Sequence, residues 1–92
     1  MIVVAIQHPV ADYEAWKSAY DERNPGTSGA KFARVNRLVS DPNTVAVVAG
    51  FESLDAANSM LESPDLKAAM DRAGVTSAPR IEVYEEAESV QY

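Results

Sequence analysis

The chain has no cysteine and only one histidine, His8, among its 92 residues. The absence of cysteine excludes disulfide bonds, zinc–thiolate sites, iron–sulfur clusters and cysteine nucleophiles. A single histidine cannot supply the histidine cluster found in many metal sites, so we expect no bound metal.

Positive charge and long apolar runs are also scarce. Eight Lys and Arg residues stand against fourteen Asp and Glu residues, a net charge of −6, which disfavours a nucleic-acid partner. No apolar run approaches the roughly 20 residues of a membrane-spanning helix, and the N-terminus lacks the basic leader and cleavage site of a signal peptide. We therefore expect a cytoplasmic protein without a membrane partner.

The length and composition fit one folded domain. With 47% hydrophobic and 24% charged residues, the chain has the composition of an ordinary globular protein. Residues 81–92 carry four glutamates and no basic residue. We expect residues 1–86 to form the domain and residues 87–92 to form an acidic tail outside it.

Hydrophobic periodicity and breaker residues predict four strands and two helical regions. Asp12 and Ser53 are suited to cap the two helices, and Asp41-Pro42-Asn43 predicts a tight turn between two strands. Ser63-Pro64 interrupts the second helical region and can restart it, and Gly74 is placed to end it. The expected elements are strands at 2–8, 30–40, 44–51 and 80–86, helical regions at 12–23 and 53–74, and a loop at 24–29.

The order β-α-β-β-α-β predicts an α+β domain of the ferredoxin-like type with a four-stranded antiparallel sheet. Two helical regions cover only one face of such a sheet, yet the strands are apolar on both faces. In the first strand, for example, Val4 and Ile6 alternate with Val3 and Ala5. A sheet face in water would carry polar residues, so we expect a second copy of the chain to cover it in a homodimer.

Several segments resemble one known superfamily. They are His8-Pro9-Val10, Asp12-Tyr13-x-x-Trp16, Ser63-Pro64-Asp65-Leu66-Lys67-x-Ala69-Met70 and Ala73-Gly74-Val75, and together they resemble the dimeric α/β-barrel superfamily. Within it, the chain is similar to antibiotic biosynthesis monooxygenase-like and small actinobacterial cyclase-like proteins. The resemblance implies a dimeric α/β barrel and a cofactor-independent monooxygenase or cyclase of secondary metabolism, on a fold that hosts many activities.

Residues 51–70 are also similar to a helix of the haem-degrading monooxygenases in this superfamily. Those proteins carry a tryptophan at the position of Met60 and the haem-ligating histidine at the position of Met70. Methionine can ligate haem iron, but both methionines follow the spacing of a core-facing helix side. We therefore expect them to pack and to line a pocket rather than to bind haem.

His8 is the candidate catalytic residue. It ends a strand, precedes Pro9 and lies next to the aromatic start of a helix. Its unperturbed pKa of about 6.5 suits a base that removes a proton from a phenol-like or enol substrate. The alternative is a structural histidine held by backbone hydrogen bonds at the strand end.

Aromatic residues supply the candidate substrate-binding wall. Tyr13, Trp16 and Tyr20 recur at i, i+3 and i+7, which places three rings on one helix face. Such a face suits a pocket for a flat ring system, and the alternative is plain core packing.

A second group of candidates lies on the strands. Phe32, Arg34 and Asn36 share one face of the second strand, and Arg34 and Asn36 would bind a carbonyl or an oxyanion there and stabilise an enolate. The alternative is a solvated outer strand whose charges discourage edge pairing. The remaining candidates for substrate binding are Phe51, Met60, Met70 and Tyr84.

Two functions from different classes fit these features. The first is a homodimeric enzyme that binds an aromatic or polyketide-like ligand between sheet and helices, and in which His8 removes a proton before oxygenation or cyclisation. For oxygenation the resulting carbanion would pass an electron to oxygen, so we expect no cofactor. The second is a non-catalytic ligand-binding or assembly module that uses the same pocket or dimer surface.

Overall fold

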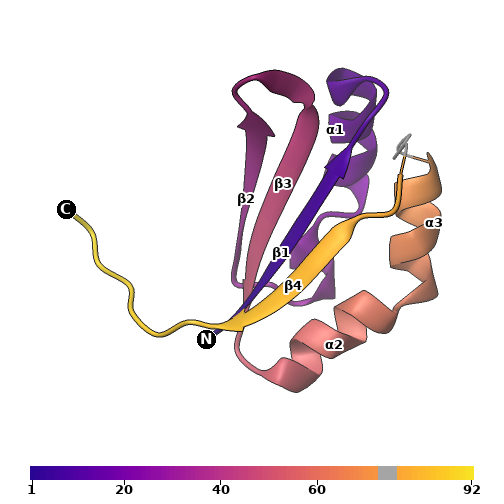
Figure 1. Cartoon of the computed structure of the whole chain (residues 1–92). Coiled ribbons are helices and arrows are strands. Elements are labelled where there is room, and N and C mark those ends of the chain that lie inside the picture. The colour runs from indigo at the N-terminus through magenta and orange to yellow at the C-terminus, as the bar shows by residue number, and fades with distance from the viewer. Residues whose placement is uncertain (73–76) are drawn as a thin grey trace.

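Four strands form one antiparallel sheet in the order β2-β3-β1-β4, and the helices of the described residues lie on one side of it (Figure 1). The computed structural model describes residues 1–72 and 77–92. The strands are β1 (Ile2–Pro9), β2 (Phe32–Leu38), β3 (Asp41–Phe51) and β4 (Arg80–Glu85). The helices are α1 (Tyr13–Glu22), α2 (Leu54–Glu62), α3 (Pro64–Arg72) and a short 3-10 helix, η1 (Pro25–Ser28). The predicted ferredoxin-like α+β fold is confirmed.

The helix ends follow the predicted caps. The Asp12 carboxylate accepts a hydrogen bond from the Ala15 N–H at 3.1 Å, and the Ser53 hydroxyl accepts one from the Ala56 N–H at 3.1 Å. Each bond satisfies a backbone donor that the first helical turn leaves unpaired. Helix α3 begins at Pro64, directly after α2 ends. The predicted cap at Gly74 lies outside the described residues.

The turn between β2 and β3 differs from the prediction. The chain reverses at Val39 and Ser40, and Asp41 already pairs with Leu38 as the first residue of β3. The Asp41 carboxylate accepts hydrogen bonds from the Asn43 N–H at 3.3 Å and the Thr44 hydroxyl at 2.9 Å. The Asp-Pro-Asn signal therefore shapes the start of β3, and the prediction of the reversal at this position was wrong by two residues.

The inner face of the sheet carries the core. Alternate residues of the central strands, Val4 and Ile6 of β1 and Val47 of β3 among them, are buried beneath the helices. Ala57 and Met60 of α2 pack on one part of this face, and Trp16 of α1 packs on the other. Leu54, the first residue of α2, is 51% exposed and lies outside this core.

No helix of the described residues covers the outer face. Its centre consists of small apolar residues: Val3 and Ala5 on β1 and Ala46, Val48 and Gly50 on β3. The Phe32 ring of β2 lies directly over Gly50, where an added Cβ would overlap the ring. Glycine at this position therefore makes room for the ring.

Residues 86–92 belong to no helix or strand, and they are exposed. Figure 1 shows this segment running away from the sheet beyond the end of β4. In the described ranges, the helices are all too short or too polar to cross a bilayer.

Candidate functional site

A cavity of about 210 Å³ lies between the inner sheet face and the helices. Its floor is Ile6 and His8 of β1 with Val47 of β3. One wall comes from α1 and the segment that follows it, and the opposite wall comes from the region where α2 gives way to α3. The residues of these walls are Trp16, Ala19, Tyr20, Arg23, Asn24, Pro25, Thr27, Ser28, Met60, Ser63, Leu66 and Met70.

His8 is the one polar side chain of the described residues that is buried, with 3% of its surface exposed. Its Nδ1 lies 3.4 Å from the Pro9 carbonyl oxygen. A carbonyl oxygen only accepts hydrogen bonds, so this contact assigns the proton to Nδ1 and leaves Nε2 as an acceptor. Every fully buried side-chain nitrogen and oxygen in the described ranges has a hydrogen-bond partner. Nε2 makes no hydrogen bond with those residues, so it is open to the cavity.

The environment of His8 favours the neutral ring. Burial lowers the pKa of His8 below its ordinary value of 6.5, and the hydrogen bond to Pro9 opposes this only in part. Removing the imidazolium from water is unfavourable, and no carboxylate ion-pairs with His8 in the described part of the chain to compensate. At neutral pH His8 therefore has an unprotonated Nε2, which is the form required of a base.

The aromatic wall predicted from the helix spacing is present. The Trp16 ring stacks on Tyr20 at a centroid distance of 5.0 Å and meets His8 edge-on at 5.8 Å. Tyr13 lies outside the cavity lining, and its ring centroid is 5.9 Å from that of Trp16. The Arg37 guanidinium lies 3.8 Å from the centroid of the Tyr13 ring. Burial raises the pKa of Tyr20, so its hydroxyl remains protonated and able to donate a hydrogen bond.

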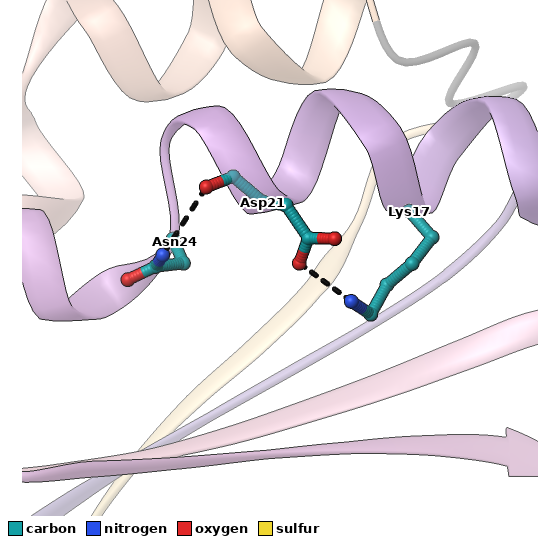
Figure 2. A network of polar contacts seen from close by, with 3 residues as sticks. All are labelled: Lys17, Asp21 and Asn24. Atoms are coloured by element: carbon teal, nitrogen blue, oxygen red, sulfur yellow. Dashed lines mark hydrogen bonds and ion pairs between the residues drawn. The ribbon is translucent and has the colours of Figure 1, made fainter.

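The segment after α1 forms the polar side of the cavity and is held by Asn24. Figure 2 shows the Asn24 amide reaching back to the end of α1, where it donates to the Asp21 carbonyl at 3.3 Å, while Lys17 pairs with the Asp21 carboxylate. The Asn24 side-chain oxygen accepts from the Gly26 N–H at 2.9 Å and begins η1. Gly29 ends η1 with a φ of 92°, a left-handed conformation that favours glycine. These bonds fix the loop predicted at 24–29 as an ordered part of the wall.

Of the predicted site residues, five line the cavity: His8, Trp16, Tyr20, Met60 and Met70. Tyr13 supports Trp16 from outside the cavity, and Phe51 is fully buried in the core beside α2. Phe32, Arg34, Asn36 and Tyr84 lie on the outer face, on the side of the sheet opposite the cavity. Side chains alternate between the two faces along a strand, so these four residues project from the face opposite His8 and cannot reach the cavity.

The polar wall of the cavity was not predicted from the sequence. Arg23, Asn24, Thr27 and Ser28 follow the aromatic stripe directly, and Trp16, Tyr20 and Arg23 share the helical spacing i, i+4 and i+7. Extending the stripe by one helical turn would have included Arg23. In the described ranges no three His, Asp or Glu side chains come close enough to hold a metal ion.

Comparison with solved structures supports the fold assignment. SnoaB, a cofactor-independent oxygenase from Streptomyces nogalater, superposes with a TM-score of 0.76 at 12% identity, over 99% of this chain and 97% of that one. A Deinococcus radiodurans protein proposed to be an antibiotic biosynthesis monooxygenase superposes with a TM-score of 0.75 at 18% identity, over 100% of this chain and 98% of that one. A conserved protein from Methanosarcina mazei superposes with a TM-score of 0.76 at 12% identity, over 92% of this chain and 91% of that one.

No protein-family profile matches the chain, and no curated protein sequence matches it significantly. The likeness is therefore one of three-dimensional structure, and at 12–18% identity it establishes the fold alone. The chain has the ferredoxin-like fold of the antibiotic biosynthesis monooxygenase-like proteins, as the resemblance of its motifs predicted.

Proposed function

We propose that the chain binds a flat aromatic or polyketide-like molecule in this cavity and that His8 removes a proton from it, as the first step of a cofactor-independent oxygenation. The observation that carries the proposal is a buried, neutral His8 whose Nε2 is open to the cavity beside the Trp16 ring. The structural similarity to a cofactor-independent oxygenase supports the same class of reaction.

The cavity suits an aromatic ligand on physical grounds. Trp16 and Tyr20 offer ring surfaces, and Ile6, Val47 and Met60 offer apolar contacts around them. A ring that enters the cavity leaves water and gains dispersion contacts with these side chains. Trp16 is also the chain's only tryptophan, so its fluorescence reports directly on occupancy of the cavity.

The proposed reaction balances without an external reductant. Nε2 of His8 takes a proton from a methylene group flanked by rings or carbonyls, and the negative charge left on carbon spreads into the ring system. Transfer of one electron to O₂ and recombination of the two radicals forms a carbon–oxygen bond, and the protonated His8 returns its proton to the peroxide. Loss of water breaks the oxygen–oxygen bond and forms a ketone, so that R₂CH₂ and O₂ give R₂C=O and H₂O. All four electrons that reduce O₂ come from the substrate carbon.

We also propose that the outer sheet face forms a homodimer. Val3, Ala5, Ala46 and Val48 make an apolar centre on this face, and the described helices leave it uncovered. A stable homodimer interface buries on the order of 2,000 Å² or more. The Val48→Asp variant should therefore become monomeric in sedimentation velocity, whereas Val39→Asp, at a hairpin tip that is 98% exposed, should stay dimeric. A wild-type monomer at micromolar concentration contradicts the proposal.

Oxygen uptake with anthrone tests the proposed chemistry. Anthrone has an acidic methylene between two aromatic rings, and its oxygenation consumes one O₂ and yields anthraquinone and water. His8→Ala should lower the rate by about 10²–10⁴-fold while circular dichroism shows an intact fold. Glu14→Ala, an exposed α1 substitution away from the cavity, should retain the wild-type rate.

The outcomes separate the competing functions. Full activity in His8→Ala would assign the base to another residue and overturn the role of His8. Cyclisation of a polyketone chain without oxygen uptake would keep the proton transfer but assign a cyclase. Quenching of Trp16 fluorescence by aromatic ligands, with no turnover of any of them, would assign a binding module.

A further inference from the structure

The outer face of the sheet is ordered in rows. The strand register places side by side Arg34 of β2, Val48 of β3, Ala5 of β1 and Glu82 of β4. β2 and β4 are the two edge strands (Figure 1), so Arg34 and Glu82 lie three strand spacings, about 14 Å, apart. The row therefore has a positive charge at one edge, a negative charge at the other, and small apolar side chains between them.

The rows on either side also have edges that match each other. One row has the Phe32 ring on β2 and the Tyr84 ring on β4, and the other has Asn36 on β2 and Arg80 on β4. Two aromatic rings attract each other, and an amide oxygen accepts hydrogen bonds from a guanidinium. Each edge residue of β2 therefore complements the edge residue of β4 in its own row.

Arg34 has hydrogen-bonding capacity that the fold does not use. Its guanidinium carbon lies 4.5 Å from the centroid of the Phe32 ring, and the side chain is exposed. It makes no hydrogen bond and no ion pair with any residue that the structure describes. A contact with an aromatic ring uses none of the five N–H donors of a guanidinium, so Arg34 is available to a carboxylate.

The Glu82 carboxylate is held in place on the same face and keeps acceptor capacity. Its Oε1 accepts a hydrogen bond from Arg80 Nε at 2.6 Å, and its Oε2 accepts one from the Tyr84 hydroxyl at 3.1 Å. An ionised carboxylate offers about four acceptor sites, so two remain. The Arg80–Glu82 pair is exposed and contributes little stability by itself. Glu82 can therefore accept a second guanidinium.

The direction of the two-fold axis decides which charges meet in a face-to-face homodimer. An axis parallel to the strands, between β1 and β3, places β2 of one subunit over β4 of the other and each row over its own copy. Arg34 then faces the partner subunit's Glu82. An axis across the strands would place each strand over its own copy, and Arg34 would face the partner subunit's Arg34. Opposite charges attract and like charges repel, so the first arrangement is favoured.

We infer that the two-fold axis of the homodimer runs along the strands and that Arg34 of each subunit forms an ion pair with the partner subunit's Glu82. This inference rests on the proposed homodimer and adds its orientation and the residues that determine it. The same axis packs Phe32 against the partner subunit's Tyr84. Arg34 and Phe32, which the sequence pattern offered for substrate binding, are then interface residues.

Sedimentation equilibrium of charge-reversal variants tests the inference. Arg34→Glu and Glu82→Arg each replace two attractions per dimer with two repulsions, so each should raise the dimer Kd about tenfold or more. The double variant Arg34→Glu/Glu82→Arg restores opposite charges and should return the Kd to the wild-type value. Lys17→Glu and Glu14→Arg make the same changes of charge on α1, on the other side of the sheet, and should leave the Kd unchanged.

A mixture of the two single variants supplies a second readout. In a mixed dimer the introduced glutamate faces the introduced arginine, and the native pair remains at the other edge. Native mass spectrometry should therefore show mostly mixed dimers, while circular dichroism shows that each variant is folded.

The outcomes separate the inference from the proposal on which it rests. Single variants with the same Kd as the α1 controls, or a double variant that stays as weak as the single ones, would overturn the inference and leave the homodimer in place. An axis across the strands predicts the first of these results, because reversal of one charge leaves like charges facing each other. A wild-type protein that is monomeric at micromolar concentration would overturn the proposed homodimer together with the inference.

Discussion

Replacement of Trp16 by alanine should destabilise the domain strongly. The indole is 4% exposed and contacts three rings, those of His8, Tyr13 and Tyr20, at centroid distances of 5.0–5.9 Å. Truncation of a buried aromatic residue to alanine costs about 3–5 kcal/mol, and a domain of this size has a total stability of about 5–15 kcal/mol. Urea unfolding followed by far-UV circular dichroism measures the loss, since the variant has no tryptophan fluorescence.

Two further variants test whether Trp16 stabilises the domain by packing in the core or only lines the surface of the cavity. Trp16→Phe keeps a ring and should lose clearly less stability than Trp16→Ala. Leu54→Ala, on the exposed side of α2, should change the free energy of unfolding by no more than about 0.5 kcal/mol. All proteins are compared at one concentration, because a dimer couples stability to concentration. A loss below about 1 kcal/mol in Trp16→Ala would refute the packing argument.

Three further predictions concern the sheet, the histidine and the tail. Gly50→Ala should destabilise the domain by about 1–3 kcal/mol, because the added methyl group would overlap the Phe32 ring and the ring would have to move away. In a Phe32→Ala background the same change should be neutral or stabilising in chemical denaturation. Folding lowers the pKa of His8, so the neutral histidine contributes its full stability above pH 6.5, and the free energy of unfolding should fall as the pH drops below 6.5 toward the pKa of the folded state. His8→Gln should flatten this part of the stability–pH curve, and an unchanged slope would contradict the lowered pKa of His8. Deletion of residues 89–92 should leave the circular dichroism spectrum and melting temperature unchanged, because this segment is exposed and outside every helix and strand; an unfolded product would show that the segment is structural.

Local features of this fold were predictable because their causes are local. The caps at Asp12 and Ser53 depend on a side chain and a backbone N–H three residues later. The aromatic spacing of Tyr13, Trp16 and Tyr20 depends only on the helical repeat. The two-sided apolar pattern of β1 likewise follows from the alternation of a strand, whatever packs on it.

The turn between β2 and β3 is a feature whose position the local sequence did not predict. Asp41-Pro42-Asn43 carries strong turn residues, but the chain reverses two residues earlier. The reversal is fixed by the register in which Val35 pairs with Val47, because a slip of one residue would turn the buried face of β3 outward. Register is a property of two strands, so a pattern within one segment does not determine it.

The sequence by itself determined the element order, the α+β class, the aromatic face of α1 and the single candidate base. Only the tertiary structure decided which candidates meet, since the pairing of β1, β2 and β3 sends Arg34 and Asn36 to the face opposite His8. It also brought Arg23 and Ser63, from segments distant in the chain, to one cavity. The physical reason is that secondary structure follows from interactions between near neighbours, whereas a cavity is the space left between elements and depends on how all of them pack.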